Sequence, residues 1–131
     1  MPAYEKPFTI EQNAGWQIQL TYADQAKAPI PLTGETNYIV RFQINDTRST
    51  SGKKLYVLDS RGGDLSDGTG SITLDTPSTG GITITIPEAD TANFDWLTAV
   101  YDALIKPPTA IAKRILQGNL KLSIGLAKIT T

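Results

Sequence analysis

The acidic side chains are the first place to look for chemistry, because the 131-residue chain contains no histidine and no cysteine. Four aspartates lie in and around a glycine-rich stretch, at Asp59, Asp64, Asp67 and Asp75. Oxygen-rich loops of this kind can hold calcium. Residues 64–68 nevertheless lack the alternating ligand positions and the closing bidentate glutamate of an EF-hand loop. We therefore expect a solvated turn that uses Asp and Gly for their backbone freedom, and no metal site.

A second acidic pair, Glu88 and Asp90, could be interpreted as the acid and base of a glycoside hydrolase. That reaction needs two carboxylates a defined distance apart in a cleft, with pKa values driven in opposite directions. Both residues follow Pro87 within one short turn, and proline and acidic side chains are typical of a helix start. The chain also lacks a phosphate loop, a dinucleotide fingerprint, a nucleophile elbow and zinc-ligand spacing. We expect neither an enzyme nor a cofactor.

The aromatic side chains Trp16, Trp96, Tyr38 and Tyr101 could form a sugar-stacking platform. Trp16 and Tyr38, however, fall on the apolar phase of alternating segments, which favours burial in a core. Trp96 follows the turn at residues 87–94, at an apparent loop edge. We therefore predict Trp96 as the exposed contact aromatic.

Charge and composition exclude further classes of partner. The 12 basic and 13 acidic residues give a net charge of −1 and are scattered, so no basic stripe is available to a nucleic acid. No apolar run approaches the roughly 18 residues that cross a bilayer, and the first seven residues lack the pattern of a signal peptide. We expect no nucleic-acid or membrane partner. The lack of cysteine excludes disulfides and fits assembly in a reducing cytoplasm.

Period-two alternation of apolar residues predicts the elements that must position these side chains. The expected strands are residues 8–22, with a break at 13–15 that indicates a bulge or a switch between sheets, then 38–44, 55–58, 71–74, 81–86, 98–105, 112–116 and 120–126. Residues 71–74 and 81–86 form a hairpin, 55–58 is covered on both faces, 87–94 is one helical turn, and Gly118 marks a bulge or a close backbone approach. The chain is thus predicted to be a single all-β domain over residues 1–131. Its architecture would be an antiparallel β-sandwich of about seven to nine strands, immunoglobulin-like or jelly-roll-like.

Several segments, taken in order, resemble small β-rich proteins encoded in the structural-gene regions of tailed phages and prophages. They are residues 10–15, 16–22, Ile30-Pro31-Leu32-Thr33-Gly34, 38–44, 70–74, 81–86, 87–94, Val100-Tyr101-Asp102 and 114–118. The chain departs from the family pattern in two places. Ala103-Leu104-Ile105 stands where Leu-Glu-Leu is frequent, and residues 106–112 hold two prolines where a glycine turn is usual.

The resemblance implies a non-enzymatic virion structural protein, made in the cytoplasm of a bacterial host. It implies a place in the tail or at the attachment of a fibre, and contacts with other virion proteins and with copies of itself in a homo-oligomer. Capsid decoration or a head-fibre role is the alternative within this class, and a carbohydrate-binding module is the alternative outside it. Residues 120–126 are predicted as an edge strand by position, and unpaired edges suit partner contacts. The candidate contact residues are Trp96, Leu120, Leu122, Ile124 and Leu126.

Overall fold

The chain folds into nine strands and one short helix in the part that the structure describes. This structure is a computed structural model, and it describes residues 4–21, 38–49, 51–62, 65–74, 81–107 and 111–126. The elements are β1 (Tyr4–Glu5), β2 (Phe8–Glu11), β3 (Trp16–Thr21), β4 (Ile39–Asn45), β5 (Lys54–Asp59), β6 (Ser71–Thr73), β7 (Gly81–Ile86), α1 (Glu88–Thr91), β8 (Thr98–Lys106) and β9 (Lys113–Ser123). None of the helices in these ranges is long and apolar enough to cross a bilayer.

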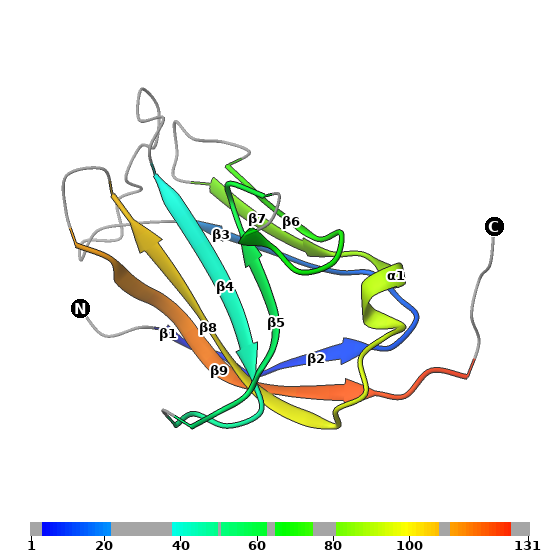
Figure 1. Cartoon of the computed structure of the whole chain (residues 1–131). Coiled ribbons are helices and arrows are strands. Elements are labelled where there is room, and N and C mark those ends of the chain that lie inside the picture. Colours follow the sequence, from blue (N-terminus) through cyan, green and yellow to red (C-terminus); the bar gives the residue numbers. More distant parts are fainter. Residues whose placement is uncertain are drawn as a thin grey trace.

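The strands form two facing layers, which confirms the predicted all-β sandwich (Figure 1). The large sheet has the order β1-β9-β8-β4-β5, with β2 also paired to β9, and the small sheet has the order β3-β7-β6. Alternation decides which side chains meet between the layers. From β4 these are Val40, Phe42 and Ile44, and from β7 they are Ile82, Ile84 and Ile86, each at most 1% exposed.

The strand order distinguishes between the two sandwich types that the sequence left open. In immunoglobulin domains one sheet contains strands B, E and D, and the other contains G, F and C, with C′ added in the variable type. Lettering β3 to β9 as B, C, C′, D, E, F and G gives B-E-D for the small sheet and G-F-C-C′ for the large one. The order is therefore of the immunoglobulin type.

The break at residues 13–15 is a switch between the sheets. The chain leaves β2 in the large sheet and enters β3 in the small sheet through a turn in which Asn13 has a φ of 70°. Asparagine tolerates this left-handed conformation better than most residues. The switch lets neighbouring segments of sequence line both sides of the same core.

The N-terminal strands depart from the predicted all-antiparallel pairing. β1 and β2 run parallel to β9, with Tyr4 opposite Leu116 and Phe8 opposite Leu120. Gly118 lies within β9, so residues 113–123 form one strand in place of the two predicted segments. A Cβ at Gly118 would collide with the backbone oxygen of Lys6, which makes the position a close backbone approach.

Three local predictions are confirmed. β6 and β7 pair antiparallel, with Ile72 opposite Ile84, as expected for the hairpin, whose connection lies outside the described residues. Of the predicted segment 55–58, residues 56–58 are buried at successive positions and Leu55 is half-buried, as expected for a strand covered on both faces. Helix α1 begins directly after Pro87, which has an extended backbone and forms the N-cap.

Candidate contact surface

Trp96 belongs to the core, so the prediction of an exposed contact aromatic is wrong. The residue is 9% exposed, and its ring lies 5.3 Å from the ring of Phe94. Phe94 in turn meets Tyr56 edge-on at 5.2 Å between ring centroids. The reason is the path of the chain after α1, at one end of the sandwich (Figure 1). This path turns both aromatic rings inward, which the local sequence does not reveal.

The predicted edge strand at residues 120–126 is also wrong. β9 has β8 on one side and β2 on the other, and Leu120 and Leu122 are 2% and 4% exposed. β8 is the preceding strand in the sequence, but β2 comes from the opposite end of the chain, so position in the sequence is a poor guide to position in the sheet. Ile124 and Leu126 follow the end of β9 and are 56% and 100% exposed. Their contact with a partner stays a prediction.

The remaining candidate aromatics also pack inside the fold. The half-buried ring of Trp16 lies 5.3 Å from Phe8 and 5.7 Å from Phe42. Tyr101 is 1% exposed, and half-buried Tyr38 packs against the core. These side chains therefore do not form the coplanar exposed platform that sugar stacking requires.

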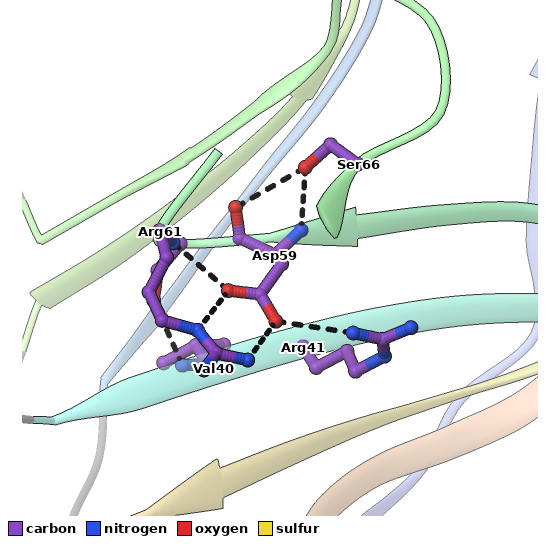
Figure 2. A network of polar contacts seen from close by, with 6 residues as sticks. Val40, Arg41, Asp59, Arg61 and Ser66 are labelled. Carbon is purple, nitrogen blue, oxygen red and sulfur yellow. Dashed lines mark hydrogen bonds and ion pairs between the residues drawn. The ribbon is translucent and has the colours of Figure 1, made fainter. Parts of the chain in front are cut away.

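Asp59, one of the calcium candidates, is a buried carboxylate held by two arginines (Figure 2). Arg61 donates from Nε at 2.9 Å and from Nη2 at 2.8 Å, and Arg41 donates from Nη1 at 3.2 Å. Hydrogen bonds from Arg61 are the main cause that lowers the pKa of Asp59 below its ordinary value of 3.8. Both carboxylate oxygens are thus engaged by guanidinium groups, and the residue is not part of a solvated turn.

The other calcium candidates do not join Asp59. Asp67 faces Lys54 at 3.8 Å, while Asp64 and Asp75 lie outside the described residues. Within the described ranges, no three His, Cys, Asp or Glu side chains come together as metal ligands.

Asp90 lies in the first turn of α1, as expected for a helix start, and is a second engaged carboxylate. Its Oδ2 accepts hydrogen bonds from the Tyr56 hydroxyl, from the Thr69 amide at 2.8 Å and from the Gly70 amide at 3.1 Å, while Oδ1 accepts from Thr69 Oγ1 at 3.0 Å. Burial and the Asp90 carboxylate raise the pKa of Tyr56. Glu88 is exposed, so the two acids do not face each other across a cleft. Asp90 instead connects α1 to the loop before β6 through these hydrogen bonds.

A third carboxylate, Asp102 on β8, repeats the pattern of Asp59. Arg114 approaches it from Nε at 3.3 Å and Arg48 from Nη1 at 3.8 Å. Arg48 also donates from Nη2 to the Tyr101 carbonyl at 2.7 Å. These side chains, with Gln43 and others, line a shallow cavity of about 320 Å³.

Both arginine clusters lie on one surface, the outer face of the large sheet. Residues opposite each other in a sheet share a face. Arg41 is directly opposite Asp59 on β5 and Leu104 on β8, and Leu104 is in turn opposite Arg114 on β9. We call this surface the arginine face and define it by Arg41, Arg48, Arg61, Arg114, Asp59 and Asp102. Its four arginines and two aspartates give a formal charge of +2, although the whole chain carries −1. The four arginine side chains are 36–50% exposed.

One signal for this face is visible in the sequence, namely the polar phase of residues 38–44, where Arg41 and Gln43 point away from the core. Nothing in the sequence links Arg48 to Asp102, which lies 54 positions away. Comparison with known proteins adds no relative, because no family model and no curated protein matches the chain.

Proposed function

We propose that this protein is a non-enzymatic structural component of a tailed-phage particle, in the tail or at the attachment of a fibre, and that it acts through protein–protein contacts. A capsid-decoration or head-fibre position is the alternative within this class. The phage setting is supported by the ordered resemblance of the segments described above. The arginine face is the observation that supports the mode of action.

Arginine is enriched at protein interfaces and among the residues that dominate their affinity. Binding by a long side chain costs conformational entropy when the side chain must be ordered. Arg41 and Arg61 are already held by the buried carboxylate of Asp59, and Arg114 is held by Asp102. Part of this conformational entropy is therefore lost before a partner binds.

The charge of the arginine face indicates the chemistry of the partner. Two guanidinium groups share each carboxylate, so each cluster keeps one positive charge in excess. A neighbouring protein with an acidic patch would be complementary to it, and such complementarity mainly determines specificity and association rate. A carbohydrate-binding role has no comparable support, because Trp96 is buried.

Cryo-EM or immunogold labelling of purified phage particles tests the proposal. We expect the protein at a fixed position in the tail or fibre-attachment region, and particles that lack it would overturn the proposal. The mode of action is tested by incorporation of the variant Arg114→Glu, with Lys113→Glu as the control. Both residues are exposed on β9, and the change of charge is the same. Loss of incorporation in Arg114→Glu alone is expected, whereas equal incorporation would refute the role of the arginine face.

A further inference from the structure

Three of the four sheet edges carry a feature that discourages pairing with another chain. On the outer edge of β5, the Asp67 amide donates to the Val57 carbonyl at 2.8 Å and the Asp59 amide donates to Ser66 Oγ at 2.9 Å, so the chain's own loop covers the edge. The opposite edge of the large sheet is interrupted by Pro7, between β1 and β2. β6, at one edge of the small sheet, has only three residues. Covering loops, proline and short length are the usual protections of edge strands.

Among the described residues, nothing of this kind protects the fourth edge, β3. It is a regular strand of six residues, Trp16–Thr21, without proline or a charged side chain. Along one side it pairs with β7 at all six positions, from Trp16 opposite Ile86 to Thr21 opposite Gly81. On its other side it has no strand partner in the described part of the chain. Every second residue of an edge strand directs its backbone N–H and C=O to that open side.

The burial of β3 is also incomplete on its core side. Trp16, Ile18 and Leu20 point to the core but are only half-buried, whereas their partners on β7 are at most 1% exposed. The open edge therefore leaves apolar surface that one added strand would cover, together with the backbone groups that β3 directs away from β7.

We propose that β3 pairs antiparallel with β3 of a second copy of this chain, which joins two small sheets into one continuous six-stranded sheet. Self-pairing fits the residues because Gln17, Gln19 and Thr21, on the outer side of β3, are exposed and neutral. A two-fold axis therefore brings no like charges together. The other long edges carry charges, such as Glu11 on β2 and Lys54 on β5. This inference deepens the proposed assembly function and rests on it for its biological role.

Among the registers that keep the core on the same side of both copies, two give the longest overlap and pair five of the six residues of β3. Opposed residues must share a face, so Gln17 lies opposite Gln19 of the second copy, or Gln19 lies opposite itself. A double variant with Gln17→Lys and Gln19→Lys places lysine against lysine in both registers. Like charges directly opposite each other destabilise strand pairing.

Sedimentation equilibrium of the full chain over a range of concentrations tests the pairing. We expect a dimer for the native sequence and a dissociation constant raised at least about tenfold for Gln17→Lys with Gln19→Lys. The matched control is Ser71→Lys with Thr73→Lys, two lysines at exposed positions on the opposite edge of the same sheet, which retains the dimer. Circular dichroism and thermal unfolding verify that each variant is folded.

A charge-swap experiment separates the interface from damage to the fold. A second double variant, Gln17→Glu with Gln19→Glu, is expected to be monomeric alone and to form a heterodimer when it is mixed with the lysine variant. Absence of the heterodimer overturns the proposal, as does a native monomer at about 1 mM. The proposal is also overturned if the control variant Ser71→Lys with Thr73→Lys loses the dimer, or if the variant Gln17→Lys with Gln19→Lys retains it.

The result is independent of the test of the proposed function. A monomeric protein that is nevertheless found on particles overturns the β3 pairing alone. A dimer that is missing from particles overturns the phage role alone. A monomer whose incorporation is lost with Gln17→Lys and Gln19→Lys assigns the edge to a strand of another protein and overturns self-pairing.

Discussion

Replacement of Asp90 by alanine is the most informative single perturbation of this fold. Asp90 is 9% exposed, and its carboxylate accepts four hydrogen bonds, from the hydroxyls of Tyr56 and Thr69 and from the amides of Thr69 and Gly70. Tyr56 itself is 4% exposed, so water has little access to its hydroxyl once the carboxylate is removed. Asp90→Ala therefore leaves buried donors without an acceptor.

The magnitude follows from the number of donors that lose their acceptor. A buried group left without a partner costs about 1–3 kcal/mol. The loop at Thr69 and Gly70 is closer to solvent than Tyr56, so its amides recover part of their hydrogen bonding from water. We expect Asp90→Ala to lower the free energy of unfolding by about 3 kcal/mol. For a domain of this size that is a fall of about 10 °C in Tm.

Asp90→Asn gives the critical contrast. An amide oxygen in the place of Oδ2 keeps the bonds from Tyr56 and from the two amides, and the NH₂ group can donate to Thr69 Oγ1, which then accepts. The expected cost is about 1 kcal/mol, from the loss of charge-assisted bonding. Urea denaturation followed by circular dichroism measures both variants, with Glu88→Ala on the exposed side of α1 as the control. A cost below about 1 kcal/mol for Asp90→Ala, or equal costs for both variants, would refute the reasoning.

Three further predictions concern other parts of the molecule. Gly118→Ala should lower the free energy of unfolding by about 2 kcal/mol, because its Cβ would collide with the Lys6 backbone; an unchanged urea midpoint would contradict this. The pKa of Asp59 is lower in the folded state than in the unfolded state, so its stabilising contribution is present above pH 3.8 and is lost as the pH falls below that value. The difference in Tm between the native chain and Asp59→Asn should therefore shrink from pH 6 toward pH 3, at about constant salt, and a constant difference would contradict the assignment. In the variant Trp16→Phe, the remaining tryptophan fluorescence comes from Trp96. Its emission should be blue-shifted relative to the unfolded chain, resistant to quenching by acrylamide and unaffected by glycans. Emission at the wavelength of the unfolded chain would contradict the burial of Trp96.

The sequence by itself determined the local elements. The alternation of Val40, Phe42 and Ile44 fixed the inward face of β4, because a strand turns successive side chains to opposite sides. The hairpin at residues 71–86 and the helix start after Pro87 were also local, since turn residues and backbone preferences act over a few positions. The break at residues 13–15 was visible, but the choice between a bulge and a change of sheet was not.

The tertiary structure alone decided which elements became neighbours, and with them the contact surfaces. The alternation of apolar residues shows which face of a strand is buried but not which strand lies beside it. The parallel pairing of β1 and β2 with β9 therefore made the predicted edge strand an interior strand. The same long-range pairing brought Arg48 to Asp102 and Tyr56 to Asp90, 54 and 34 positions apart in sequence. It also placed Trp96 in the core and left β3 at a sheet edge with no second strand partner among the described residues. Contacts between distant segments depend on the packing of whole sheets, and a short window of sequence contains no record of that packing.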